Sequence, residues 1–256
     1  MKRTTASWAL LVVLCGFPAR ASESRAGAVR FEHVTRPEGD YEVAWVDPTR
    51  ARIKLRWKGA DDVPLETLMA ARAATEAEGR RFRFATNAGM YAKSLAPLGL
   101  YVEGGRRLVK ANRSHASKGN FFLAPNGVFS VTGTGSGVSA AVRETSAFLN
   151  AKAAPDFASQ SGPMLVVDGA LHPAFSKGSP NRKFRSGVGV DGAGRVAFAI
   201  STAPVNFYDF GLLFRDALAC ANALYLDGTI SSFLEDKGAS VQAAAFVGIW
   251  TVDEER

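Results

Sequence analysis

Glycine-containing turn dipeptides separate short apolar runs through the middle of the chain, and this pattern constrains the fold more than any other feature. Gly-Gly, Asn-Gly or Asp-Gly lies inside each of four such segments, at residues 98–110, 120–131, 163–172 and 184–201. These dipeptides readily adopt the positive φ angles that two-residue β-hairpin turns require. The chain is therefore predicted to form successive hairpins, and the sheet that they build is predicted to be mostly antiparallel.

Two segments have the spacing of helices instead. Pro64 opens the first, whose apolar residues fall on one helical face, and Gly79 marks its end. The second covers residues 209–223 and runs directly into an apolar strand, and a short helix is also expected within residues 142–158. We therefore predict one α+β domain over residues 41–256, with a mixed, mostly antiparallel sheet of hairpins and a few packed helices.

The first 21 residues have the three parts of a secretory signal peptide. Basic residues precede an apolar run, and small residues then stand at positions −3 and −1 of a cut after Ala21. Leu14 occupies the position where a lipid-attachment site has a small residue, which argues against a lipoprotein anchored at Cys15. The sequence therefore predicts a periplasmic or secreted protein, with a polar, flexible segment over residues 22–40.

Charge and cysteine content exclude several classes of protein. Removal of residues 1–21, which carry three basic residues and no acids, lowers the net charge from +7 to +4. Without a dense Lys/Arg block, this charge argues against nucleic acid as a partner and suits an anionic substrate. No later stretch has the roughly 20 apolar residues of a transmembrane helix. Cys220 is the one cysteine left after cleavage, so it is predicted to be a buried hydrophobic residue.

The histidines and the glycine-rich stretch do not form a known catalytic motif. His33, His115 and His172 lack the spacing of a zinc site, and the sequence has no G-x-S-x-G nucleophile elbow. The stretch at residues 133–137 lacks the lysine of a P-loop and is interpreted as a plain loop. These patterns predict neither a cofactor nor a metal.

Four short motifs place polar side chains or glycines at turns beside apolar runs, where a folded sheet presents groups to a ligand. Their candidate residues are Asn87, Gly89, Gln160, Gly162, Arg185, Asp227, Gly228, Ser231 and Ser232. The planar guanidinium of Arg185 suits a phosphate, and Asp227 after an apolar strand suits acid–base chemistry. Each residue also has a structural alternative, such as a turn cap for Asn87 and a solvated side chain for Arg185.

These motifs, in this order, resemble the phosphodiester glycosidases related to the uncovering enzyme, N-acetylglucosamine-1-phosphodiester alpha-N-acetylglucosaminidase, and especially their small exported bacterial members. The resemblance covers residues 40–252 and rests on "TNAGMY", "GNFFLAPNGVF", "SQSGPMLVVDG", "FRSGVGVDGAGRVAFAIS" and "LYLDG". The motif positions of the family fall on Asn87, Gln160, Arg185, Asp227, Gly228 and Ser231. Ala88 and Thr229-Ile230 stand where the uncovering enzyme has glycines, which leaves the substrate of this chain open.

The resemblance implies hydrolysis of a sugar-1-phosphodiester at the glycosidic C1–O bond. It gives Arg185 the role of holding the phosphodiester, and Asp227 that of stabilising an oxocarbenium-like centre or activating water. The substrate-binding residues are then expected to be Asn87, Gly89, Gln160, Gly162, Gly228, Ser231 and Ser232. A second carboxylate is not evident from the motifs, and the candidates are Glu103, Asp168 and Glu235.

Other functions stay open on the sequence. A non-catalytic module on the same fold would bind anionic polysaccharide without turnover. Ser231 or Ser232 would alternatively be the nucleophile of an esterase or phosphodiesterase. A divalent cation held by Asp227, Glu235 and Asp236 is also left open, although no ligand spacing indicates one.

Overall fold

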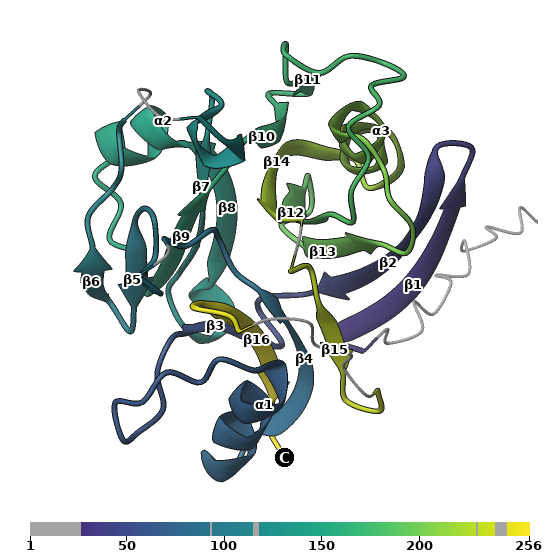
Figure 1. Ribbon diagram of the computed structural model, residues 1–256. Coiled ribbons are helices and arrows are strands. Elements are labelled where there is room, and N and C mark those ends of the chain that lie inside the picture. The colour runs from purple at the N-terminus through teal and green to yellow at the C-terminus, as the bar shows by residue number, and fades with distance from the viewer. Residues whose placement is uncertain (1–26, 93, 115–117, 229, 239–244) are drawn as a thin grey trace, which may run out of the picture.

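The computed structural model describes residues 27–256 except residues 93, 115–117, 229 and 239–244. The predicted signal peptide, Cys15 and His115 lie outside the described residues. Three sheets and a few short helices make up the described chain (Figure 1).

Every pair of neighbouring strands in the described chain is antiparallel. The seven-stranded sheet contains β1 (Val29–Arg36), β2 (Gly39–Val46), β13 (Val196–Ser201), β12 (Ser186–Asp191), β14 (Cys220–Asp227), β10 (Met164–Val167) and β11 (Ala170–Leu171), in that order. The four-stranded sheet contains β15 (Phe233–Glu235), β4 (Arg81–Asn87), β16 (Ile249–Glu254) and β3 (Arg52–Arg56). The five-stranded sheet contains β6 (Arg106–Val109), β5 (Tyr101–Glu103), β9 (Phe157–Ser161), β7 (Gly127–Thr132) and β8 (Ser139–Glu144). The predicted α+β fold with a mostly antiparallel arrangement of hairpins is confirmed.

The first predicted helix is α1 (Leu68–Ala77), which packs on β4 and β16. It begins later than Pro64 because Thr67 is its N-cap, with the Thr67 hydroxyl accepting a hydrogen bond from the Ala70 N–H at 2.9 Å. Gly79, with a φ of 75°, ends it as predicted. None of the helices among the described residues is long and apolar enough to cross a membrane.

The other helices are shorter than the sequence indicates. Within residues 142–158, α2 covers Thr145–Asn150. The segment predicted as helical over 209–223 contains α3 (Phe207–Leu212) and a π-helical turn (Leu213–Ala217), and β14 then begins at Cys220. The helical prediction fails at its C-terminal end because residues 220–227 pair with β12 and β10, so sheet formation overrides the local apolar spacing. Short 3₁₀ turns also occur at Asn120–Phe122 and Gly135–Gly137.

The prediction of a flexible segment over residues 22–40 is wrong from Val29 onward. β1 pairs with β2 from Val29↔Val46 to Arg36↔Gly39, so these residues form a regular hairpin. β1 is an edge strand with one face toward solvent, so polar residues alternate with apolar ones along it. Such a mixture of polar and apolar residues is easily taken for a loop when the partner strand is not known.

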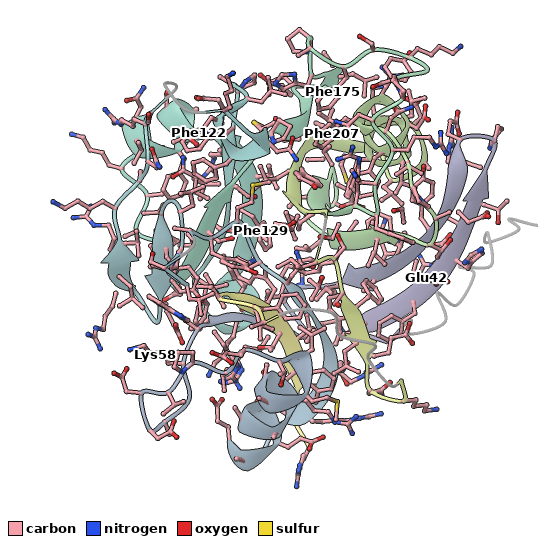
Figure 2. The ribbon with its side chains drawn as sticks, viewed as in Figure 1. Glu42, Lys58, Phe122, Phe129, Phe175 and Phe207 are labelled. Atoms are coloured by element: carbon pink, nitrogen blue, oxygen red, sulfur yellow. The ribbon has the colours of Figure 1, made fainter. Side chains whose placement is uncertain are left out.

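The three sheets meet in one aromatic cluster, which makes a continuous core. Phe129 of the five-stranded sheet packs against Phe198 of the seven-stranded sheet, with ring centroids 5.6 Å apart. Phe129 also packs against Trp250 of the four-stranded sheet at 4.7 Å, and Phe84 lies 5.5 Å from Phe198. Figure 2 shows Phe129 near the middle of the molecule. Each sheet therefore buries one face against the other two, which fixes how the ends of their strands are placed.

Glu78, the C-cap of α1, binds three cations of β3 and gives the fold a testable pH dependence. Its carboxylate accepts hydrogen bonds from Arg52, Lys54 and Arg56 at 3.0, 2.9 and 2.7 Å. Burial on its own would raise the pKa of Glu78, but the hydrogen bonds from Arg56 and Lys54 outweigh it and lower that pKa to about 2. Because the folded pKa lies below the ordinary value of 4.5, the stabilisation is complete above pH 4.5 and is lost as the pH falls toward 2.

We therefore expect Glu78→Gln to lower the Tm at neutral pH and to have little effect near pH 2. Thermal unfolding of the variant and the wild type across this range measures the difference. A Tm difference that stays constant down to pH 2 would contradict the assignment.

Candidate active site

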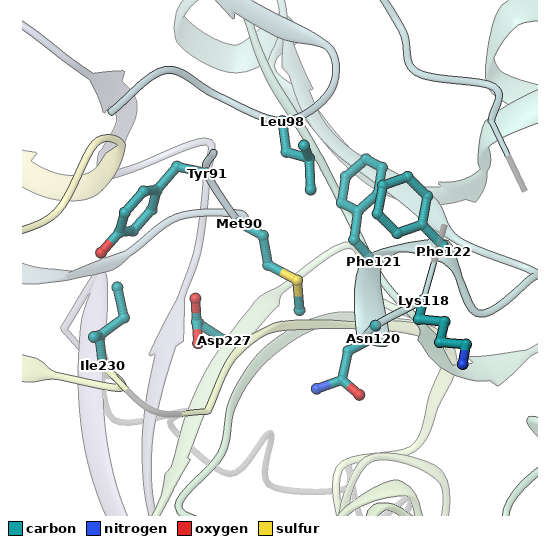
Figure 3. A pocket seen from close by; sticks show the side chains of 10 residues that line it. Met90, Tyr91, Leu98, Lys118, Asn120, Phe121, Phe122, Asp227 and Ile230 are labelled. Atoms are coloured by element: carbon teal, nitrogen blue, oxygen red, sulfur yellow. The ribbon is translucent and has the colours of Figure 1, made fainter. Parts of the chain in front are cut away.

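A cleft of about 390 Å³ lies at the end of β14, where that strand finishes at Asp227. Its wall combines apolar and aromatic side chains with a carboxylate, an ammonium group, an amide and a phenol (Figure 3). The lining residues are Met90, Tyr91, Leu98, Lys118, Gly119, Asn120, Phe121, Phe122, Asp227 and Ile230. Among the acidic residues of the described chain, Asp227 is the one that lines this cleft.

The sheet places the Asp227 carboxylate at the cleft. β14 runs between β12 and β10, and the three residues before Asp227 are buried. The main-chain carbonyl of Asp227 accepts hydrogen bonds from Ser186 Oγ at 3.2 Å and from Ser231 Oγ at 2.8 Å. The carboxylate itself accepts a hydrogen bond from the Gly228 N–H. Because the backbone is anchored on both sides, the carboxylate is held in one place at the end of a rigid strand.

Gly228 is needed for close packing behind the carboxylate. A Cβ at this position would collide with the Tyr225 hydroxyl and would lie 3.0 Å from the Phe184 carbonyl oxygen. Tyr225 is buried, and the Phe184 oxygen belongs to the main chain, so neither group can move away without a cost in free energy. From the sequence, Gly228 is expected to bind substrate; the structure shows instead a close approach by a side chain of the protein itself, that of Tyr225.

We expect Gly228→Ala to displace the loop that carries Asp227 and to cost about 1–3 kcal/mol of unfolding free energy, as overpacking does in well-packed sites. Gly192→Ala is the matched control, because a Cβ there meets nothing within 4 Å. Urea denaturation of both variants measures the effect. Equal stabilities of the two variants would contradict the tight packing at Gly228.

Asn87 lies in the interior and joins three segments. Its Nδ2 donates to Ser186 Oγ at 3.0 Å, and its Oδ1 accepts from the Ser232 N–H at 3.2 Å. β4 is thereby tied to β12 and to the loop that follows β14. Since the side chain is 1% exposed and all these partners are protein groups, Asn87 is positioned to hold the segment around Asp227. It is not among the residues that line the cleft.

Gln160 is likewise buried and hydrogen-bonded to protein. Its Oε1 accepts from the N–H groups of Leu100 and Asn112, and its Nε2 donates to the Asn112 carbonyl at 2.8 Å. Gln160, in β9, therefore holds the two ends of the segment from Leu100 to Asn112, which contains β5 and β6. Gly89 and Gly162 serve packing as well: a Cβ at Gly89 would collide with the Gln160 carbonyl, and one at Gly162 would lie 2.6 Å from the Asn126 Cβ.

Arg185 is 1% exposed and is not among the residues that line the cleft. Its Nε donates to the Val205 carbonyl at 2.8 Å and its Nη2 to the Asn181 carbonyl at 2.9 Å. The guanidinium carbon stands 3.6 Å from the centroid of the Phe207 ring. These two hydrogen bonds and the ring contact engage the guanidinium with protein groups. The geometry therefore does not favour direct binding of a phosphodiester by Arg185. The ammonium group of Lys118 is the cation that lines the cleft.

The serines after Asp227 hold the backbone in place. Ser231 Oγ donates to the Asp227 carbonyl, and the Ser232 carbonyl accepts from Thr86 Oγ1 at 2.8 Å. In the part of the chain that the structure describes, no hydrogen bond joins either serine hydroxyl to a histidine or a carboxylate. The geometry therefore gives no support to a serine nucleophile, which needs an adjacent base.

The three candidates for a second carboxylate lie away from the cleft lining. Asp168 sits in the turn between β10 and β11, where its carboxylate accepts from Asn222 Nδ2 at 3.2 Å. Burial raises the pKa of Glu103 in β5 and that of Glu235 in β15. Within the described ranges, no three His, Cys, Asp or Glu side chains gather in an arrangement that would hold a metal ion.

Sequence reasoning missed most of the cleft. Asn120 lies within the motif "GNFFLAPNGVF" and Tyr91 ends the motif "TNAGMY", but neither residue is among the candidates taken from the sequence. Lys118 precedes the same "GNFF" segment, yet an isolated lysine on a loop gives no local signal. Of the nine candidates taken from the sequence, Asp227 lines the cleft, and the others surround or support it.

Comparisons with known proteins find a matching family and a similar curated protein. The family model for phosphodiester glycosidases matches residues 80–244. The uncharacterized protein YigE of Escherichia coli (strain K12) is 39% identical over 194 residues, which are 76% of this chain and 74% of YigE.

Two solved structures have a similar fold. The catalytic domain of zebrafish N-acetylglucosamine-1-phosphodiester alpha-N-acetylglucosaminidase, auto-inhibited by its pro-peptide, has a TM-score of 0.61 and 15% identity, over 91% of this chain and 85% of that one. A protein from Synechocystis has a TM-score of 0.55 and 16% identity, over 88% of this chain and 62% of that one.

The family match includes the whole candidate site. Residues 80–244 contain all the residues that line the cleft, Asp227 among them. The match spans well over half of the chain, and YigE is similar over most of its own length. The chain therefore belongs to the phosphodiester glycosidase family.

Proposed function

We propose that this protein hydrolyses a sugar-1-phosphodiester at the glycosidic C1–O bond, with Asp227 as the acting carboxylate. Water supplies the oxygen that bonds to C1 while the bond from C1 to the bridging oxygen breaks. The products are the free sugar and a phosphomonoester that keeps the bridging oxygen. A phosphate is a better leaving group than an alcohol, so strong help from a second carboxylic acid is less necessary than in ordinary glycosidases.

The position of Asp227 carries this proposal. A carboxylate held rigidly at the end of a buried strand, with its side chain in a cleft, is suited to stabilise positive charge at C1 or to accept a proton from the attacking water. Burial is the main cause that raises the pKa of Tyr91 and of Tyr225, and the negative charge of Asp227 raises both pKa values further. The Asp227 carboxylate therefore lies near both phenols.

The rest of the cleft suits a sugar attached to an anion. Met90, Leu98 and Ile230 offer apolar contact to the face of a sugar ring, and Tyr91 adds an aromatic wall. Lys118 brings a positive charge to the same cleft, as the phosphodiester needs. An envelope or extracellular glycan carrying a glycosyl phosphodiester is therefore the proposed substrate class.

The mature protein is proposed to act in the periplasm or outside the cell. Support for this location comes from the signal-peptide pattern of residues 1–21 and the cleavage site after Ala21.

The test is hydrolysis in ¹⁸O-labelled water. Purified mature protein is incubated with UDP-N-acetylglucosamine and with an alkyl N-acetylglucosamine-1-phosphodiester, with and without EDTA, and both products are analysed by mass spectrometry. Cleavage at C1–O places the label in the sugar. Label in the phosphate would instead identify a phosphodiesterase and refute the proposal, and the EDTA arm tells whether a divalent cation takes part.

The same preparation separates the enzyme from a glycan-binding module. If no sugar is released, calorimetric titration with anionic envelope polysaccharide tests for binding without turnover. Tight binding with no release from any phosphodiester would favour the binding module over the hydrolase.

A further inference from the structure

The structure has a second cleft, which is larger than the one at Asp227. Its volume is about 660 Å³, against about 390 Å³, and no residue lines both. Three segments that are far apart in the sequence contribute to it: residues 48–54, which include the start of β3, residues 133–135, and residues 156–157. Arg80 and Glu255, next to the start of β4 and the end of β16, also line it.

The two clefts lie at opposite ends of the same strands. β4 begins just after Arg80, which lines the second cleft, and leads to Met90 and Tyr91, which line the first. β7 likewise follows Phe122 of the first cleft and ends beside Gly133 of the second (Figure 1). A strand of seven residues is roughly 20 Å long, so a single sugar unit cannot occupy both clefts. The second cleft is therefore a separate site.

A buried carboxylate holds two arginines of the second cleft in place. The Asp253 side chain is 0% exposed, and it accepts hydrogen bonds from Arg52 Nε at 3.0 Å and from Arg80 Nε at 2.8 Å. Arg52 Nη2 also donates to Asp253, at 3.1 Å, and to Glu78. In the described part of the chain, no hydrogen bond uses Nη1 of Arg52 or Nη2 of Arg80. Each guanidinium is therefore fixed in position and keeps an N–H₂ group for a ligand.

Positive charge predominates in the second cleft. Four cations and two acids line it: Arg50, Arg52, Lys54 and Arg80 against Asp156 and Glu255. The Asp156 carboxylate is used by the protein, since it accepts a hydrogen bond from the Gly133 N–H at 2.7 Å, and the Glu255 side chain is 90% exposed. The balance stays positive when Glu78 and Asp253 are counted together with Arg56, since five cations then stand against four acids. This charge favours an anionic ligand.

The rest of the second cleft suits a sugar. Phe157 is half-buried in its wall with Val131 and Val138, so the cleft offers aromatic and apolar contact. The Thr134 side chain is exposed and makes no capping hydrogen bond at its 3₁₀ turn, so its hydroxyl can bind a sugar hydroxyl. A Cβ at Gly135 would meet nothing within 4 Å, so the glycine-rich loop leaves the cleft open there. The stretch that the sequence indicates as a plain loop thus forms part of a binding cleft.

We propose that the second cleft binds an anionic segment of a glycan chain. The N–H₂ groups of Arg52 and Arg80 bind a phosphate or carboxylate of the glycan, and the Phe157 ring packs against a neighbouring sugar. A glycan held there keeps its other units at a high local concentration around Asp227. That last step rests on the proposed function, whereas the binding of an anionic glycan does not.

The binding is tested by calorimetry with glycans that contain no glycosyl phosphodiester. A phosphorylated pentamannose and a pentagalacturonate carry the two kinds of anionic group, and maltopentaose is the neutral comparison. The wild type is expected to bind an anionic pentasaccharide at least about 10-fold more tightly than maltopentaose, and the two anionic arms tell which group is preferred. Failure to bind either anionic pentasaccharide, or equal binding of maltopentaose, would overturn the proposal.

Two variants locate the binding. Arg80→Gln is expected to raise the Kd for the anionic pentasaccharide about 10-fold, and Arg52 still holds the buried Asp253 in this variant. Thr134→Glu adds a negative charge at an exposed position and leaves the ion pairs of the cleft in place, so it should weaken binding as well. An unchanged Kd in either folded variant would overturn the assignment to the second cleft.

Arg215→Gln is the matched control for Arg80→Gln. Arg215 also donates to a carboxylate, that of Asp216 at 2.6 Å, but it lines neither cleft. Its variant should bind the anionic pentasaccharide with the Kd of the wild type. An equal loss of affinity in both arginine variants would mean that overall charge, and not the second cleft, determines the binding.

A kinetic test separates this proposal from the proposed function. The polymeric substrate is carboxymethylated dextran that carries N-acetylglucosamine-1-phosphodiester groups, and the small one is the alkyl N-acetylglucosamine-1-phosphodiester. Arg80→Gln should raise the KM for the polymer about 5- to 10-fold and leave kcat/KM for the small substrate unchanged, because the small substrate reaches only the cleft of Asp227. Equal losses on both substrates would overturn the separate role of the second cleft. If the wild type releases no sugar from either substrate, the proposed function fails, and the calorimetric result still decides whether the second cleft binds a glycan.

Discussion

Asp227→Asn is expected to lower turnover of a glycosyl phosphodiester by at least about 10³-fold, as the loss of a charged catalytic group does in a preorganised site. The substitution keeps the size and the hydrogen-bonding shape of the side chain but removes the negative charge. The neutral amide of the variant can neither stabilise positive charge at C1 nor accept a proton from the attacking water. Steady-state release of sugar by the variant and the wild type measures the effect.

Controls for this variant come from the other candidate carboxylates. Glu103→Gln and Asp168→Asn remove acids that lie outside the cleft lining, so both should keep most of the activity. The fold of Asp227→Asn should also be intact, because the hydroxyls of Ser186 and Ser231 donate to the main-chain carbonyl of residue 227 and not to its side chain. If the variant loses little turnover and only some affinity for anionic glycans, the protein is a binding module.

Asn87→Ala is expected to have the largest effect on stability, about 3 kcal/mol of unfolding free energy, because it leaves buried polar partners unsatisfied. The partners are Ser186 Oγ and the Ser232 N–H, both in the interior. The loss also frees the segment around Asp227 from β4, so turnover should fall together with stability. Urea denaturation monitored by tryptophan fluorescence measures the first effect.

Asn222→Ala is the matched control for Asn87→Ala. Asn222 also joins two segments through its amide, to the backbone and side chain of Asp168, but at the surface. Water replaces those hydrogen bonds, so its loss should cost well under half as much. A similar cost for both variants would show that the Asn87 network does not hold the fold as described.

Much of the fold was predictable because its signals are local. The turn dipeptides at 104–105, 168–169 and 191–192 join paired strands as predicted, whereas Asn126-Gly127 follows a 3₁₀ turn, leads into β7 and forms no hairpin. Turn chemistry depends on two or three neighbouring residues, so it is readable from sequence. The end of the second helix could not be predicted in this way, because residues 220–223 become a strand only through pairing with β12 and β10.

Most of the hairpins, the first helix and the carboxylate at the end of an apolar strand are readable from the amino-acid sequence, since each depends on a short contiguous stretch. Which polar residues reach the cleft depends on how distant segments fold together. Arg185 is buried because Phe207, Val205 and Asn181 enclose it, and Asn120 faces the cleft beside Asp227, more than a hundred residues away in sequence. Burial and hydrogen bonding between distant segments follow from how three sheets pack on one core, and no local pattern encodes that packing.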